Sequence, residues 1–313
     1  MLNLAQLSPS LLFIIMINDI GFNDQKNNAG DLITSKRNLK QANEIHLKFV
    51  DDLTLAEAIN LPEQLVKVPG SQELTLPVQN SRVYRQLLEV RDQSETNQMK
   101  LNYKKTKVMV FNPCKSKVFM PRLVLEGNPL EVVEETKLLG LTIRSDMKWI
   151  SNTEDMVKRG SKRLWLLRRL KFLGASVSNL LEVYTKQIRC ILELAAPAWQ
   201  GGITLAEKQD LERVQKCATH IILGSDYTSY QDALETLQLD SLEQRRTTLA
   251  LRFAIKAEKH SKFKAWFKPT TKPINTRTKM PKYCDVKANH SRFTRSPLSY
   301  LTRTLNMYYH KKD

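Results

Sequence analysis

The hydrophobic period of the chain changes near residue 150, and this change limits the possible folds more than any other feature of the sequence. Before it, short apolar runs alternate with polar residues and end at turn residues, which is typical of strands. After it, apolar residues recur every three or four positions, which is typical of helices packed on a core. The sequence therefore predicts an α+β region over residues 1–150, an all-helical region over residues 151–260 and a tail over residues 261–313.

The first region is predicted to hold a small sheet with helices. Residues 11–17 are its most apolar run, and we expect a buried helix there. Seven residues are too few to span a bilayer, and no basic residue precedes them as in a signal peptide. A hairpin is predicted where residues 45–50 and 53–55 alternate on either side of Asp51 and Asp52. Further elements are predicted as a helix over residues 81–99 and strands over residues 108–111, 123–125 and 137–143.

Two helix starts in the second region carry the residues of a capping box. Thr204 and Ser241 each stand three residues before a Glu or Gln, Glu207 and Gln244. Each hydroxyl can therefore accept one free amide while the partner side chain reaches back to another. The two predicted helices run to about residues 224 and 259, and two earlier helices are predicted over residues 156–172 and residues 180–196, the latter ended by Pro197.

The net charge of +17 is concentrated in the tail. Residues 1–150 carry +2, residues 151–260 carry +4 and residues 261–313 carry +11. This excess favours an anionic partner, with nucleic acid and an anionic membrane as the first alternatives. Prolines stand among the basic residues of the tail, so we expect it to be loosely structured; they are Pro269, Pro273, Pro281 and Pro297.

The four cysteines are too few for a disulfide scaffold in a chain of 313 residues. We therefore expect no disulfide partner and a reducing, intracellular location in the nucleus or the cytoplasm, without secretion or membrane insertion. Cys190 and Cys217 stand on apolar helix faces and are predicted to be buried. No cysteines have the paired spacing of a zinc site.

Asp51 and Asp52 are the one pair of adjacent carboxylates flanked by predicted strands. Two such groups on a tight turn repel each other unless a cation lies between them. Divalent ions held in this way can activate an attacking hydroxyl and neutralise a leaving pyrophosphate, as nucleotidyl transfer requires. The alternative is an ordinary solvated turn.

Short motifs follow one another in a fixed order along the chain: SPSLLF at residues 8–13, INDI at 17–20, FVDD at 49–52, KLNYKKTK at 100–107 and KLLG at 137–140. Together they resemble the palm motifs of reverse transcriptases of non-LTR (LINE-type) retrotransposons, most closely those of jockey/CR1-like elements. Segments further along are similar to the thumb and C-terminal portion of these proteins: APAW at 196–199, LERVQK at 211–216, DSLEQRR at 240–246 and SPL at 296–298.

The resemblance implies a partial polymerase palm, an antiparallel sheet with helices, followed by an all-helical thumb-like region. It implies RNA-templated DNA synthesis as the reaction of the intact family, with an RNA template and a DNA primer as partners and Mg²⁺ or Mn²⁺ as cofactor. Asp51 and Asp52 would be the catalytic metal ligands, and Lys105 would approach the nucleotide phosphates. Contacts to the nucleotide or template are implied for Ser8, Pro9 and Asn102.

The chain departs from the family pattern ahead of the Ser8-Pro9 pair. Family members have Pro-Gln-Gly there, where this chain has MLNLA at residues 1–5. Their first palm motif, with a third metal-binding aspartate, and their fingers have no counterpart in these residues. We therefore expect an N-terminally truncated reverse transcriptase that lacks useful polymerase activity by itself, because one bridging metal ligand is missing.

Basic residues crowd the helix predicted over residues 156–172. In a thumb they would follow the backbone of the primer–template duplex, and the alternative is a solvated face. The residues expected to contact the nucleic-acid backbone are Lys158, Arg159, Lys162, Arg163, Arg168 and Arg169.

Two further functions stay open from the sequence. The first is a non-catalytic RNA- or DNA-binding protein that uses the basic helix and the tail, and the second is a helical interaction protein without a nucleic-acid role. Aromatic residues of the tail would either stack on bases or face inward in a folded cap. They are Trp266, Phe267, Tyr283, Phe293, Tyr300, Tyr308 and Tyr309. The sequence does not define an oligomeric state.

Overall fold

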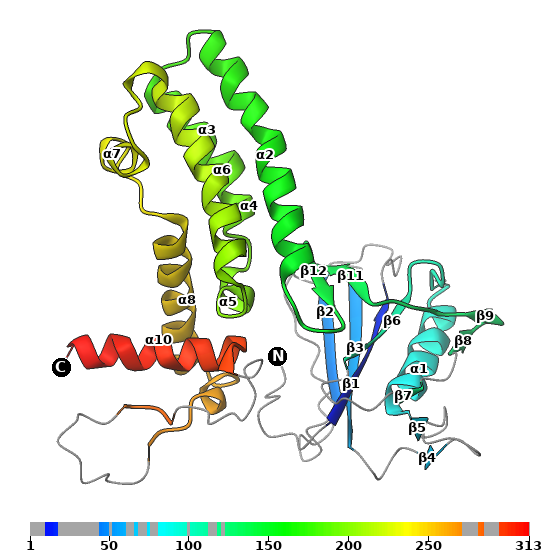
Figure 1. Cartoon of the computed structure of the whole chain (residues 1–313). Helices are drawn as coiled ribbons and strands as arrows, with labels where there is room; N and C mark the ends of the chain where they lie inside the picture. The colour runs from blue at the N-terminus through cyan, green and yellow to red at the C-terminus, as the bar shows by residue number, and fades with distance from the viewer. Residues whose placement is uncertain are drawn as a thin grey trace. The chain divides into compact units, whose positions relative to one another are not determined.

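The computed structural model combines helices and strands in two compact units (Figure 1). The first unit comprises Met1–Lys137 and Arg144–Met147, and the second comprises Leu138–Ile143 and Lys148–Asp313. The structure describes residues 10–17, 44–49, 52–60, 66–67, 74–75, 81–98, 101–111, 118–119, 123–270, 281–284 and 294–312.

A five-stranded sheet forms the first unit, in the order β10-β6-β1-β3-β2. Its central strand β1 (Ser10–Ile17) pairs antiparallel with β3 (Asp52–Asn60) on one side and with β6 (Lys107–Phe111) on the other. The outer strand β2 (Glu44–Phe49) is antiparallel to β3, and β10 (Glu131–Val132) is parallel to β6. The predicted hairpin over residues 45–55 is confirmed, since Phe49 pairs directly with Asp52.

The prediction of a helix over residues 11–17 is wrong, because this run is the strand β1. A short apolar run has no period that separates a buried strand from a buried helix. Pairing decides the outcome here: both edges of β1 face a strand, so its backbone groups find partners in β3 and β6. The run also contains three Ile and one Phe, which favour strands.

Helix α1 (Arg82–Thr96) confirms the helix predicted over residues 81–99. Its N-terminus is held by a carboxylate from the sheet, because Glu57 of β3 accepts hydrogen bonds from the amides of Arg82 (2.9 Å) and Val83 (3.0 Å). Ser81 serves as the N-cap. A negative charge at this end of a helix is favourable, and it ties α1 to β3.

Short strands complete the β structure. The strand predicted over residues 137–143 is a hairpin, because Leu139 (φ 49°) and Gly140 (φ 82°) form a two-residue turn with positive φ at both positions. This hairpin lies where the chain passes from the first unit to the second. The short strands are β4 (Val66–Lys67), β5 (Leu74–Thr75), β7 (Val118–Phe119), β8 (Val124–Leu125), β9 (Asn128–Pro129), β11 (Glu135–Leu138) and β12 (Leu141–Arg144).

The second unit is built on two long helices, α2 (Ile150–Phe172) and α6 (Leu205–Leu223), which lie side by side in Figure 1. Leu164, Leu167 and Leu211 are among the apolar side chains buried in its core. The remaining helical segments are α3 (Val177–Val183), the π-helical η2 (Tyr184–Arg189), α4 (Cys190–Leu192), α5 (Ala196–Trp199), η3 (Gly224–Asp226), α7 (Tyr230–Thr236), α8 (Leu242–Lys259), η4 (Lys264–Trp266) and α10 (Pro297–Lys312).

Both predicted capping boxes are present. At the start of α6 the amide of Glu207 donates to Thr204 Oγ1 (3.3 Å), and the amide of Thr204 donates to Glu207 Oε2 (2.7 Å). At the start of α8 the same exchange joins Ser241 and Gln244, at 3.3 and 3.1 Å. The predicted start of α2 is wrong by six residues, since the helix begins at Ile150.

The single helix predicted over residues 180–196 is divided in the structure. After α4 the chain turns at Ala195, whose φ is 48°. Pro197 does not end a helix but lies in the first turn of α5, where its missing N–H leaves no hydrogen bond unmade. Trp199 fixes this turn, because its side chain is fully buried and its Nε1 donates to the carbonyl of Leu194 at 2.8 Å.

The prediction of a loosely structured tail is wrong for its described part. Figure 1 shows α10 lying across α8, and the two helices share an apolar core. Tyr283 is joined to α10 by two backbone–side-chain hydrogen bonds with Asn306, both 2.9 Å. The packing of periodic apolar residues on two helices thus orders this part of the tail despite its prolines. The buried apolar residues of α8 and α10 are Ala250, Ala254, Ala257, Leu301 and Leu305.

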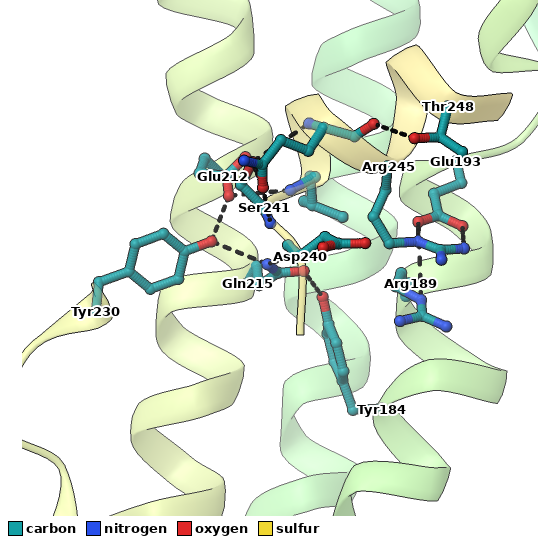
Figure 2. Close-up of polar contacts among 12 residues, drawn as sticks. Tyr184, Arg189, Glu193, Glu212, Gln215, Tyr230, Asp240, Ser241, Arg245 and Thr248 are labelled. Carbon is teal, nitrogen blue, oxygen red and sulfur yellow. Dashed lines mark hydrogen bonds and ion pairs between the residues drawn. The ribbon is translucent and has the colours of Figure 1, made fainter. Parts of the chain in front are cut away.

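A chain of hydrogen bonds crosses the core between α6, η2 and α7 (Figure 2). Gln215, which is fully buried, accepts from the hydroxyl of Tyr184 and donates to the hydroxyl of Tyr230 (2.9 Å) and to the carbonyl of Asp240 (3.0 Å). The Tyr230 hydroxyl donates in turn to Glu212. Burial raises the pKa of both tyrosines, so their hydroxyls stay protonated as donors.

The prediction that Cys190 and Cys217 are buried is wrong. Both are exposed and free, as is Cys284. Cys217 is exposed because it lies on the outer face of α6, whereas the next residues, Ala218 and Thr219, face the core. Over the part of the chain that the structure describes, no helix combines the length and the apolar character needed to cross a membrane.

Candidate nucleic-acid interface

Of the predicted catalytic residues, Asp52 belongs to the β2–β3 hairpin and Lys105 to the turn before β6. Asp52 is the first residue of β3 and pairs with Phe49. Asp51, Ser8 and Pro9 lie outside the described residues. Asp52 therefore begins the second strand of an antiparallel hairpin, and this strand lies next to the central strand of the sheet.

Asn102 and Lys105 lie in the turn that leads into β6. Asn102 Oδ1 accepts a hydrogen bond from the amide of Lys105 at 3.3 Å, so the amide side chain shapes the turn itself. The Lys105 side chain is exposed. Thr106 follows, fully buried, and its hydroxyl donates to the Asn102 carbonyl at 2.9 Å. In this turn Asn102 has a structural role, while the lysine projects from a fixed backbone.

Within the described segments, no group of three or more His, Cys, Asp or Glu side chains is arranged to hold a metal ion. Because Asp51 lies outside these segments, the predicted Mg²⁺ or Mn²⁺ ligands Asp51 and Asp52 stay a prediction.

The six residues predicted to contact a nucleic-acid backbone all lie on α2, but they differ in their surroundings. Arg159 is held by Asp155, with 2.9 Å between Nε and Oδ2. Arg163 donates to the carbonyl of Gln187. These two cations thus have partners within the protein, although Arg163 is itself exposed. We call the remaining four, which are all exposed, the four exposed cations: Lys158, Lys162, Arg168 and Arg169.

A seventh cation of α2 has a structural role. Lys171 Nζ donates to the carbonyls of Ile221 (2.7 Å) and Ile222 (3.0 Å) in the last turn of α6. These carbonyls have no partner within their own helix, and a positive charge is favourable at that end. Lys171 therefore joins α2 to α6 and does not belong to the exposed set.

The four exposed cations share a surface without acidic residues of α2. The last carboxylate of the helix is Asp155, so residues 156–172 carry no Asp or Glu. Lys158, Lys162 and Arg168 make no hydrogen bond or ion pair with the described part of the chain, and the Arg169 guanidinium lies 5.6 Å from the ring centre of Phe172. This concentration of positive charge on a helix surface without carboxylates attracts polyanions.

Two aromatic side chains lie on the same face, and the pattern of charge alone does not predict them. Trp165 is 66% exposed and Phe172 is 79% exposed. The spacing in the sequence does indicate that these rings share a helix face with cations. Alternating intervals of four and three residues separate the members of the set Lys158, Lys162, Trp165, Arg169 and Phe172. Such a row lies along one side of a helix. We call these five residues the basic–aromatic row.

The aromatic residues of the tail are arranged differently. Phe267 and Tyr283 are 3% and 7% exposed and pack in the core between α8 and α10. Lys282 lies over the ring of Tyr309, 3.7 Å from its centre, and also pairs with Glu258. For these residues the structure matches the alternative of an inward-facing cap, while Phe293 lies outside the described residues.

Comparison with protein-family models, with curated proteins and with solved structures gave no match to the chain. The assignment of a function therefore depends on the residues and geometry described above.

Proposed function

We propose that the chain binds nucleic acid through the exposed basic face of α2, and that it derives from the non-LTR retrotransposon reverse transcriptases that its motifs resemble. The observation that carries the binding proposal is the set of four exposed cations, Lys158, Lys162, Arg168 and Arg169, on a helix surface without carboxylates. Nucleic acid presents the matching charge, because each nucleotide carries one phosphate and binding releases condensed counterions.

The spacing of the cations also supports this partner. At a rise of about 1.5 Å per residue, Lys158 and Arg169 are about 16 Å apart along the axis of α2. One strand of a duplex has a phosphate about every 3.4 Å, so this length corresponds to about five nucleotides. Several cations can thus contact one strand at the same time, whereas a merely solvated face needs no such alignment.

The test is the salt dependence of RNA binding by the full chain. Binding of a labelled single-stranded RNA is measured by fluorescence anisotropy at several salt concentrations, for the wild type and the triple variant Lys158→Gln/Lys162→Gln/Arg169→Gln. Each phosphate contact contributes about 0.7 to the slope of log K against log salt, so three lost contacts should flatten the slope by about 2.

A charge-matched control removes three exposed cations from α8, in the variant Arg252→Gln/Lys256→Gln/Lys259→Gln. The proposal predicts that this variant keeps a slope close to the wild-type value. Equal flattening in both triple variants would show a response to net charge alone and would contradict a site on α2.

A second function, polymerisation, is favoured by one observation, the β2–β3 hairpin with Asp52 as the first residue of β3. Asp51 and Asp52 would hold Mg²⁺ or Mn²⁺, whose preferred ligands are carboxylate oxygens, and the metal would supply activation of the primer hydroxyl. We expect the 313 residues alone to show no primer extension on an RNA template. Extension by the wild type that is lost in the Asp51→Asn variant would assign the activity to this chain.

A further inference from the structure

The basic–aromatic row combines two kinds of side chain that serve different parts of a nucleic acid. Lys158, Lys162 and Arg169 carry positive charge, while Trp165 and Phe172 offer flat, uncharged surfaces. Large aromatic side chains are mostly buried in folded proteins, yet these two are 66% and 79% exposed. A row of cations and exposed aromatic rings on one helix face is complementary to a partner that has both negative charge and flat apolar groups.

We propose that α2 binds single-stranded nucleic acid by stacking unpaired bases on Trp165 and Phe172, in preference to duplex. This inference rests on the proposed function, because it specifies which nucleic acid the same face selects. The cations of the row contact phosphates on either side of the stacked bases. Stacking on an aromatic side chain contributes to the binding of each base and tolerates any base, since all four have a π face.

The distance between the two rings agrees with this mode of binding. Trp165 and Phe172 are seven residues apart, which is about 10.5 Å along the helix axis. Bases at about 3.4 Å intervals span this distance in about three steps. A strand that lies along α2 can thus place one base on each ring without a bend in the helix.

A duplex does not fit the same surface as well. Its bases are stacked on one another and paired, so only their edges in the grooves and the terminal pairs are accessible to side chains. The two rings would then contact sugar and phosphate and would lose the stacking energy. The cations would still contact the backbone, so duplex binding is expected to be weaker but to retain its salt dependence.

The experiment compares the wild type with Trp165→Leu and Phe172→Leu in the full chain. Anisotropy is measured with a labelled, unstructured 20-nucleotide RNA and with the blunt duplex of the same sequence. We expect each variant to bind the single strand about tenfold more weakly, within the range of stacking contributions, and to bind the duplex within about twofold of the wild type. Trp165→Phe, which keeps an aromatic ring, should retain most of the affinity.

Phe253→Leu is the matched control, because Phe253 is an exposed aromatic residue on α8, outside the row. It should leave both affinities unchanged. Since both rings of the row are exposed, the variants should keep the far-ultraviolet circular dichroism of the wild type. Equal losses for single strand and duplex, or no loss for either, would overturn stacking as the basis of selection.

The charge variants separate this inference from the proposal on which it rests. If Lys158→Gln/Lys162→Gln/Arg169→Gln flattens the salt slope while Trp165→Leu does not affect the single strand, α2 binds nucleic acid without stacking, and only the further inference fails. If neither set of variants changes binding, both fail. If an acidic protein binds the row and RNA does not, both are likewise overturned.

Discussion

Replacement of the fully buried Gln215 by leucine is expected to destabilise the second unit, mainly because the hydroxyl of Tyr184 loses its hydrogen-bond acceptor. In the wild type, Gln215 accepts from Tyr184 and donates to Tyr230 and to the carbonyl of Asp240 (Figure 2). Leucine has a similar volume but no polar atom, so these bonds are lost with little change in packing. The Tyr184 hydroxyl, which is fully buried, then has no acceptor.

The loss of unfolding free energy depends on which of the polar groups that bind Gln215 can form another hydrogen bond. The Tyr230 hydroxyl keeps Glu212 as its acceptor, and Asp240 is exposed, so water can replace the donor to its carbonyl. Tyr184 has no such replacement, and a buried donor without a partner costs about 1–3 kcal/mol. We expect Gln215→Leu to lower the free energy of unfolding by about 2–3 kcal/mol, with the Tyr184 hydroxyl as the main contributor.

Tryptophan fluorescence during urea unfolding is a suitable assay, because all four tryptophans of the chain, at positions 149, 165, 199 and 266, belong to the second unit. Tyr184→Phe and the double variant Tyr184→Phe/Gln215→Leu complete a double-mutant cycle. When both partners are removed, no buried donor is left unpaired, so the double variant should be more stable than the sum of the single losses predicts, by about 1–2 kcal/mol. Additive losses, within about 0.5 kcal/mol, would refute the reasoning.

Three further outcomes are expected in the second unit. Thr204→Ala removes one half of the capping box of α6 and should lower the free energy of unfolding by about 1 kcal/mol, while Thr204→Ser should keep most of it; urea titration compares the two. Gly201→Ala would place a Cβ atom 2.4 Å from Cβ of Tyr300, so α10 should be displaced and digested faster by a protease. An unchanged digestion rate would contradict the close approach. Burial opposes ionisation of Glu258, but hydrogen bonds from Lys282 and two tyrosines outweigh it and lower the pKa of this carboxyl. Its contribution to stability is therefore present above the ordinary carboxyl pKa and is lost as pH falls through the lowered value. The difference in unfolding free energy between the wild type and Glu258→Gln should shrink between about pH 5 and pH 3, and a constant difference would argue against this contact.

Elements that depend on neighbours in the sequence were predictable. The capping boxes at Thr204 and Ser241 need only a hydroxyl and a partner three residues later, so the sequence located both helix starts. The hairpin that contains Asp52 also depends on local alternation. Part of the candidate interface was predictable for the same reason, because the cations of α2 follow directly from the sequence.

Elements that depend on distant partners were not predictable. Residues 11–17 form a strand because β3 and β6, about 40 and 90 residues further along, supply hydrogen-bond partners on both edges. The tail folds because α8 offers an apolar face to α10 across residues that separate them in the sequence. Neither partner can be identified from the periodicity of the segment itself.

The sequence by itself determined where α6 and α8 begin, where the hairpin with Asp52 lies and which helix is crowded with basic residues, because these properties depend on residues within one or two turns of each other. Only the tertiary structure decided which of those charges are available. It pairs Arg159 with Asp155 and uses Lys171 to join α2 to α6, while it leaves Trp165 and Phe172 exposed beside the remaining cations. The reason is that exposure of a side chain is set by what packs against its helix, and that depends on the fold of the whole unit.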